Sequence, residues 1–269
     1  MRYDDGACTT CGAFVPSDLV SEGVVGGYVV AANEVEAEER AGDTASVRVT
    51  IGSGSASPRL EQRVERFDRG RSASRELEGS QEVLYVVSGR GRLHVGGRAY
   101  ELEPDLGAYV AAGEAYEVEN ASAEELVLVC VRAAQEEQPS HDPDRRTVRF
   151  ADREALPAKP NREFRYLVNQ DLGCPDVTQF LGLIPPGKAP MHSHTYDEVI
   201  YVVEGEGVLH LNGKEAPIAA GSCIHLPPLE EHCLENTGER TMRVLGVFHP
   251  SGDPASRSYE DDPELAPVA

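Results

Sequence analysis

Four side chains in the C-terminal half carry the strongest chemical signal in the sequence. His192 and His194 are separated by one residue, Glu198 follows four residues later, and His232 comes further along the chain. Residues two apart on a strand share a face, so the two histidines point the same way, and Glu198 joins them if the strand phase survives the intervening turn. Three imidazoles and one carboxylate suit Mn, Fe, Co, Ni, Cu or Zn and leave one or two coordination positions open. The pattern predicts one divalent transition metal per chain, at which water, substrate or dioxygen can be polarised or activated.

Several polar neighbours could assist such a site. The second N–H of each imidazole needs an acceptor, for which Asn236, Glu235 or backbone carbonyls are candidates. His225 is interpreted as a pocket wall residue in preference to a proton carrier, and Tyr196 as lining the pocket entrance or covering the rim. The two glutamates that precede His232 could supply a general base, although a solvated loop is the better interpretation in so acidic a chain.

An internal repeat positions these residues. Residues 82–97 and 198–213 are identical at ten of sixteen positions with a constant offset of 116. Both copies consist of short valine-rich segments, often alternating with period 2, separated by glycines that suit hairpin turns. Helical periodicity is weak, so two closed antiparallel barrels or sandwiches in tandem are the natural architecture.

The repeat also divides the chain. We expect an N-terminal arm at 1–45, a first barrel at 46–135, a linker and leading strand at 136–163, a second barrel at 164–250, and an acidic tail at 251–269. The linker is polar, charged and interrupted by proline, as expected for a connecting segment.

The first copy lacks every imidazole of the predicted set. At the offset of 116, the four positions hold Glu76, Glu78, Glu82 and Tyr116. Such carboxylates would suit only a hard cation, so we expect a structural or lid-forming role for this copy. His94 in the first copy corresponds to His210 in the second. Because this histidine is also present in the copy that lacks the metal set, we expect it to serve packing or solvent contact.

The two motifs of the second copy resemble those of the cupin superfamily. The first consists of Gly187 and His192-x-His194-x3-Glu198-x6-Gly205, and the second is Gly221-x5-Pro227-x4-His232-x3-Asn236. Two departures are small: the first glycine is one residue closer to the histidines than usual, and Leu229 stands where the family often has glycine. With the repeat, the chain resembles a bicupin. This implies an all-β fold of two tandem, jelly-roll-like cupin β-barrels, with metal in the C-terminal barrel.

Composition excludes several partners. Lys and Arg number 25 against 46 Asp and Glu, a formal charge of −21 that disfavours nucleic acid and anionic membranes. No apolar segment approaches the roughly 20 residues of a membrane helix, and the N-terminus lacks a signal-peptide layout, so we expect a soluble, cytoplasmic protein. Cys8-x-x-Cys11 has no second pair to complete a zinc site. A small organic molecule is the expected partner, and pairing of exposed sheet edges would make a homodimer.

The leading functional hypothesis is an oxidoreductase of the cupin dioxygenase type, in which Glu198 could loosen from the metal and act as a catalytic base. Apolar pocket walls are expected from Phe180, Leu183, Ile200, Leu226 and Leu234. One alternative is a non-oxidative metalloenzyme, namely an isomerase, lyase or aminohydrolase; another is a small-molecule-binding or sensory cupin without turnover. An oxalate-decarboxylase-like reaction fits less well. The resemblance implies two complete metal sites in that group, whereas only one set of ligands is complete in this chain. Open metal positions favour an enzyme over a binder.

Overall fold

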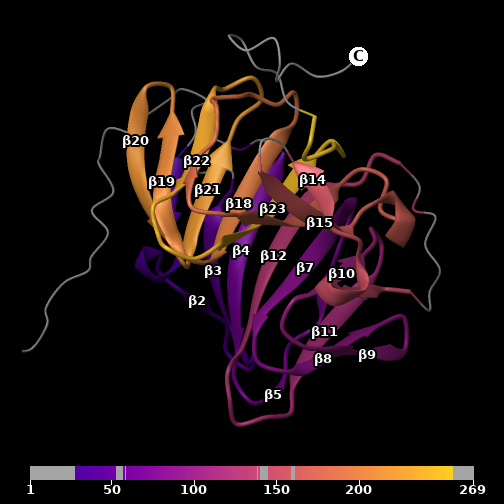
Figure 1. The fold of residues 1–269 in the computed structure, drawn as a ribbon. Coiled ribbons are helices and arrows are strands. Elements are labelled where there is room, and N and C mark those ends of the chain that lie inside the picture. Colours follow the sequence, from indigo (N-terminus) through magenta and orange to yellow (C-terminus); the bar gives the residue numbers. More distant parts are fainter. Residues whose placement is uncertain are drawn as a thin grey trace, which may run out of the picture.

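The computed structural model describes residues 28–52, 57, 59–137, 139, 145–158 and 161–256, and these residues are nearly all in strands and turns. The strands form two similar halves, one following the other along the chain, and each half has one large and one small sheet (Figure 1). The all-β prediction is therefore confirmed. None of the helices in these ranges has the length and apolar character that a bilayer-spanning segment needs.

In the first half, the large sheet has the strand order β13-β10-β7-β12-β4-β3-β2. Its strands are β2 (Glu38–Glu39), β3 (Ala45–Ile51), β4 (Leu60–Phe67), β7 (Ser80–Ser88), β10 (Leu106–Val110), β12 (Leu126–Ala134) and β13 (Thr147–Arg149). The small sheet contains β5 (Gly70–Arg71), β6 (Arg75–Glu76), β8 (Gly91–Val95), β9 (Arg98–Leu102) and β11 (Ala115–Asn120).

The second half repeats this plan, with the large sheet in the order β1-β21-β18-β23-β16-β15-β14. Its strands are β1 (Tyr28–Ala31), β14 (Leu156–Ala158), β15 (Arg162–Val168), β16 (Thr178–Ile184), β18 (Asp197–Glu204), β21 (Ser222–Leu226) and β23 (Met242–His249). The small sheet contains β17 (Gly187–Lys188), β19 (Glu206–Leu211), β20 (Lys214–Ala219) and β22 (His232–Asn236). Three short 3₁₀ helices are η2 (Ala32–Glu34), η3 (Phe150–Asp152) and η4 (Gln170–Leu172).

Two edge strands cross between the halves. β1 precedes the first barrel in the chain but pairs antiparallel with β21 of the second, with Tyr28 opposite His225. β13 precedes the second barrel but pairs antiparallel with β10 of the first, with Thr147 opposite Ala108. The segments expected to form an arm and a linker thus each complete the large sheet of the other half, and this reciprocal exchange ties the barrels together.

The continuous apolar runs of β7 and β18 lie in strands that are buried on both faces. Leu84 and Ile200 pack inside their own barrels, whereas Val83 and Val199 belong to one core shared by both halves. A strand that faces two cores needs apolar side chains at successive positions, which explains why these runs do not alternate. The strand that carries Glu198 is therefore held from both sides.

Candidate metal centre

The three predicted histidines of the second barrel come together in the folded chain. One ring nitrogen of each lies within 4.8 Å of the others, and all three residues are buried. His192 and His232 face each other in an antiparallel bridge: the His192 N–H donates to the His232 carbonyl at 3.0 Å, and the His232 N–H donates to the His192 carbonyl at 2.9 Å. This backbone pair sets the spacing of two imidazoles without any contribution from their side chains.

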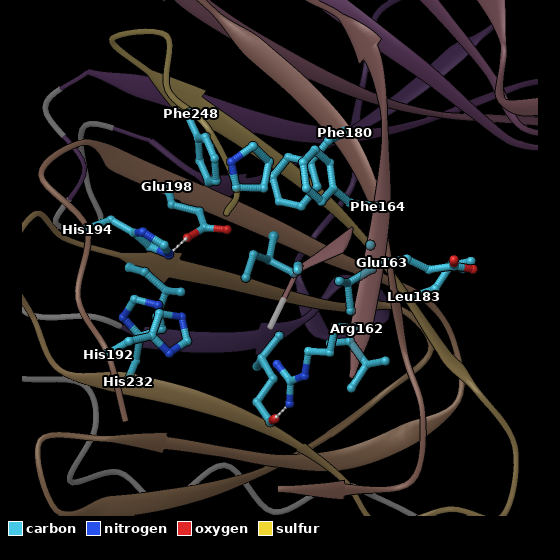
Figure 2. A pocket seen from close by; sticks show the side chains of 18 residues that line it. Arg162, Glu163, Phe164, Phe180, Leu183, His192, His194, Glu198, His232 and Phe248 are labelled. Carbon is cyan, nitrogen blue, oxygen red and sulfur yellow. Dashed lines mark hydrogen bonds and ion pairs between the residues drawn. The ribbon is translucent and has the colours of Figure 1, made fainter. Parts of the chain in front are cut away.

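Glu198 joins the histidines from the neighbouring strand β18. Its Oε2 lies 3.7 Å from Nε2 of His194, and both side chains line the same cavity as His192 and His232 (Figure 2). The side chains of His194 and Glu198 therefore point to the same side despite the turn between His194 and β18, as the spacing predicted. The structure brings all four residues together, while their binding of a metal stays a prediction.

The hydrogen bonds at Nδ1 orient the imidazoles. His192 Nδ1 lies 3.1 Å from the Pro190 carbonyl, and His232 Nδ1 lies 2.8 Å from the Glu230 carbonyl. Likewise, His194 Nδ1 is 3.2 Å from the carbonyl of Ser256. A carbonyl can only accept, so a hydrogen on Nδ1 completes each of these contacts and makes Nε2 the nitrogen suited to a metal; the Tyr196 hydroxyl is a second neighbour of His194 Nδ1, at 2.9 Å. Neutral imidazoles in this tautomer beside a carboxylate are the donor set that divalent transition metals take.

Of the three alternatives for the imidazole partners, backbone carbonyls are the ones that the structure shows, whereas Asn236 and Glu235 bond elsewhere. The Asn236 amide donates to the carbonyls of Ile184 and Arg240 at 2.8 and 2.7 Å. Glu235 pairs with Nε2 of His210 at 2.7 Å, and the first barrel repeats this contact between His94 and Glu119 at the same distance. In both barrels the recurring histidine thus pairs with a glutamate of the neighbouring strand, which agrees with a packing role.

His225 lies on the other face of the sheet, so neither proposed role at the cavity holds. In the register between β18 and β21 it pairs with Val199, one residue beyond Glu198, and its side chain therefore points away from the barrel interior. Its Nε2 lies 2.7 Å from Asp197 Oδ1, and Ser57 of the first barrel donates to Asp197 Oδ2 at 2.8 Å. His225 belongs to a buried polar cluster between the barrels.

Tyr196 packs behind the site. Its ring stacks on His194, with centroids 4.8 Å apart, and on Phe248 at 4.1 Å, and its hydroxyl lies 2.9 Å from His194 Nδ1. It is not among the residues that line the cavity, and neither are Glu230 and Glu231. Glu230, one of the two glutamates considered as a general base, has its backbone carbonyl beside Nδ1 of His232.

The cavity at the histidines is small and mostly apolar. The volume of this cavity is about 60 Å³. The five predicted wall residues all line it, and further apolar walls come from Phe164, Ile184, Val244 and Phe248. Arg162 also lines the cavity and was missed. The alternation of buried and exposed residues along β15 could have identified it, because Arg162 and Phe164 are buried and Glu163 is exposed.

The first barrel has an arginine where the second has its histidine cluster. Glu82, the counterpart of Glu198, is fully buried; it accepts hydrogen bonds from the Arg63 guanidinium and, at 2.9 Å, from the hydroxyl of Tyr116, the counterpart of His232. Burial alone would lower the pKa of Arg63, but the carboxylates of Glu82 and Glu65 raise it well above its ordinary value. The guanidinium therefore supplies the positive charge at this position.

Two further groups in the first barrel are poor metal sites. Glu76 and Glu78 are exposed and thus do not join Glu82 in a carboxylate cluster. Glu65, Glu82 and Cys130 are close enough to share an ion, but Arg63 binds both carboxylates. Burial raises the pKa of the Cys130 thiol well above its usual value, which disfavours the thiolate at neutral pH. Cys8 and Cys11 lie outside the described residues.

Comparisons with known proteins identify the family. The profile of a family described as "Cupin domain" matches twice, at residues 63–132 and 180–248. The oxalate-binding protein of Thermotoga maritima is 41% identical over 67 residues, which are 24% of this chain and 55% of that protein. The chain spans about half the length of the curated relatives it matches.

Solved structures share the whole architecture. A putative glyoxylate-induced protein of Pseudomonas aeruginosa has a TM-score of 0.74 at 17% identity, over 92% of this chain and 94% of that one. A variant of Bacillus subtilis oxalate decarboxylase has a TM-score of 0.67 at 14% identity, over 83% and 77% of the two chains. At these identities the likeness establishes the fold alone.

Proposed function

This chain belongs to the cupin family and carries two cupin domains, and from this premise we propose that its second barrel is a metal-dependent oxidoreductase centre of the dioxygenase type. The ligands of the single metal ion are His192, His194, Glu198 and His232. The observation that carries the proposal is the meeting of three imidazoles and one carboxylate at a cavity with apolar walls. When bound, the metal supplies Lewis-acid polarisation and redox chemistry toward dioxygen.

The protein side chains have separate tasks in this proposal. The imidazoles hold the ion, and backbone carbonyls keep their Nε2 atoms directed at it. The phenylalanine side chains at the cavity exclude water and pack on the substrate. Glu198 is the one carboxylate of the ligand set, and its oxygen would accept a proton from a substrate in the cavity.

A non-oxidative reaction is the second candidate. It is favoured by the oxalate-binding relative and by the fold shared with an oxalate decarboxylase. A structure of that Bacillus subtilis enzyme describes its Mn(II) centers, which favours Mn among Mn, Fe, Ni, Cu and Zn. This candidate predicts turnover without dioxygen.

Elemental analysis tests the metal site. We expect one equivalent of a transition metal in the purified full-length chain and loss of that metal in His192→Ala. His210→Ala is the matched control, because His210 pairs with Glu235 outside the cavity and its removal leaves the metal in place. Unchanged metal content in His192→Ala would contradict the assignment.

The reaction type is tested with the metal-loaded chain and a panel of small β-diketones, enols and keto acids. Oxygen uptake that depends on substrate and disappears in His192→Ala supports the oxidoreductase. Equal turnover in anaerobic buffer supports the non-oxidative candidate. Binding without any turnover in either condition would contradict both and indicate a sensory cupin.

A further inference from the structure

The ring of Phe180 forms one wall of the cavity in the second barrel. Phe180 lies on β16 and is 8% exposed, and its ring centroid is 6.0 Å from that of Phe164 and 4.9 Å from that of Phe248. Figure 2 shows Phe164 and Phe180 on the side of the cavity away from His192 and His232. A molecule bound at the histidines therefore meets these rings at its other end.

The place of this ring depends on a glycine of the neighbouring strand. Gly246 of β23 lies directly opposite Phe180, and a Cβ at Gly246 would come within 2.3 Å of Cε1 and Cζ of the ring. The φ of Gly246 is not in the left-handed region, so the backbone conformation alone would accept a residue with a side chain. The space that Gly246 leaves open is thus taken by the ring of Phe180.

The first barrel differs at this pair of positions. Cys130 is the counterpart of Gly246 at the offset of 116, and Arg63 lies opposite Cys130. The guanidinium of Arg63 extends to Glu82, the counterpart of Glu198. A ring that rests on bare backbone is therefore a feature of the barrel that carries the histidines and does not come from the fold that both barrels share.

The volume of the cavity limits what fits beside this ring. The cavity measures about 60 Å³. A water-sized group needs roughly 10–15 Å³ of such a volume, so the cavity takes a molecule of about four to six non-hydrogen atoms. Metal ions held by imidazoles and a carboxylate accept oxygen donors, and the phenylalanine rings favour an apolar part at the other end of the molecule.

We propose that the substrate is a compact, oxygen-bearing molecule of about two to four carbon atoms, and that Phe180, placed by the space at Gly246, excludes larger ones. The oxygen end binds at the predicted metal ligands, and the alkyl end packs on Phe180. The chemistry at the metal rests on the proposed function, whereas the size limit follows from the cavity walls alone. Phe180 is therefore a residue that determines specificity.

Calorimetric titration of the metal-loaded, full-length chain tests the size limit with two hydroxamates, because a hydroxamate chelates a divalent metal through its two oxygens. Acetohydroxamate is within the limit, and benzohydroxamate exceeds it by most of a phenyl ring. We expect the wild type to bind acetohydroxamate at least about tenfold more tightly. In Phe180→Ala the loss of the ring should raise the affinity for benzohydroxamate at least about tenfold, which removes or reverses the preference.

Indole tests the same limit in the chelated chain, without any metal. It is larger than the ring that Phe180→Ala removes, so it fits only where the space of that ring joins the existing cavity. We expect saturating indole to raise the Tm of Phe180→Ala by about 2–4 °C and to leave the Tm of the wild type unchanged. Phe150→Ala is the matched control, because Phe150 packs under Arg165, 4.5 Å from its guanidinium, and does not line the cavity. Its responses to indole and to both hydroxamates should match the wild type.

Gly246→Ala tests the position of the ring from the other strand. The added methyl group displaces Phe180 into the cavity, so the affinity for acetohydroxamate should fall at least about tenfold. The double variant Phe180→Ala/Gly246→Ala has no ring to displace and should regain that affinity. Phe180→Leu removes only part of the ring's volume and should gain less affinity for benzohydroxamate than Phe180→Ala does, which keeps the test decisive if Phe180→Ala fails to fold.

The outcomes separate the size limit from the proposed function. Equal affinity of the wild type for the two hydroxamates would overturn the role of Phe180 even if the metal is present. So would a Phe180→Ala variant that binds neither benzohydroxamate nor indole more tightly than the wild type. A rise in Tm with indole in Phe180→Ala but not in the wild type supports the size limit even if no preparation contains metal, in which case only the proposed function fails.

Discussion

Leu229 adopts a backbone conformation that leucine rarely takes. Its φ is +66° and its side chain is 71% exposed, so packing does not compensate. The left-handed region costs an L-residue about 1–2 kcal/mol. The backbone N–H of Leu229 donates to the carbonyl of His194 at 2.6 Å, and this bond holds the loop before His232 against the loop that carries His194. The family resemblance placed glycine at this position, and the positive φ explains that preference.

We therefore expect Leu229→Gly to stabilise the protein by about 0.5–1 kcal/mol, because the strain relieved exceeds the conformational entropy that glycine loses on folding. Urea denaturation measures the change. Leu229→Ala is the control, since alanine keeps the strain and should leave stability near the wild-type value. A glycine variant less stable than the alanine variant would show that the strain is not present. Metal content should be the same in all three proteins.

At the scale of elements, the segment after β23 closes one side of the site. The Gly252 N–H donates to Thr178 Oγ1 at 3.2 Å, and the Ser256 carbonyl binds Nδ1 of His194. Pro254 lines the cavity, and a Cβ at Gly252 would come within 2.3 Å of the Tyr196 ring. Residues 251–256, called here the strap, therefore supply one of the three carbonyls that orient the histidines.

Truncation tests the strap. A chain ending after Pro250 loses the Ser256 carbonyl at His194 Nδ1 and the Asp253 carbonyl to which the neighbouring Tyr196 hydroxyl donates. Outer partners of this kind typically contribute 10- to 100-fold in metal affinity. We expect metal binding to weaken by at least about tenfold, measured by competition with a chromophoric chelator. A chain ending after Glu260 retains the strap and should bind like the full-length protein. Equal affinities of the two truncated chains would mean that the strap does not orient His194.

The elements also show what could be predicted from the sequence. The two barrels followed from the internal repeat, and the grouping of His192, His194 and Glu198 followed from strand spacing. His232 was placed with them by the resemblance to the cupin motifs. Backbone carbonyls were among the expected partners of the imidazoles, but the residues that supply them could not be predicted, because any residue offers a backbone carbonyl. His225 was misplaced because its face depends on the register of β21 against β18, and Arg162 was missed because its inward direction depends on the strand phase of β15.

At the scale of the whole molecule, the first barrel is part of the support of the second. Its Ser57 bonds to Asp197, the residue before Glu198, and its large sheet supplies half of the shared core. β1 and β13 cross between the halves in opposite directions. The barrel without the histidine set therefore has a structural role, because the strand that carries Glu198 packs against it.

Two thiols in the shared core report on this arrangement. Burial raises the pKa of Cys174 and of Cys223 to about 12. The thiolate is the reactive form, and an ordinary thiol with a pKa near about 8.5 would be half ionised at that pH. Because a raised pKa keeps these thiols protonated, and because they are covered, we expect neither to react with iodoacetamide at pH 8.5 in the native chain. Both should react in guanidinium, as mass spectrometry of the peptides will show.

Deletion of residues 1–31 removes β1 and uncovers the edge of β21, where Val30 pairs with Cys223. Alkylation of Cys223 should then become measurable in native buffer, while Cys174, which donates to Gln81 of the first barrel, stays protected. Reaction of both thiols at equal rates would mean that the deletion separates the barrels altogether. Continued protection of Cys223 would mean that the crossing of β1 adds nothing to the closure of the core, and the reciprocal exchange would then not be what holds the two halves together.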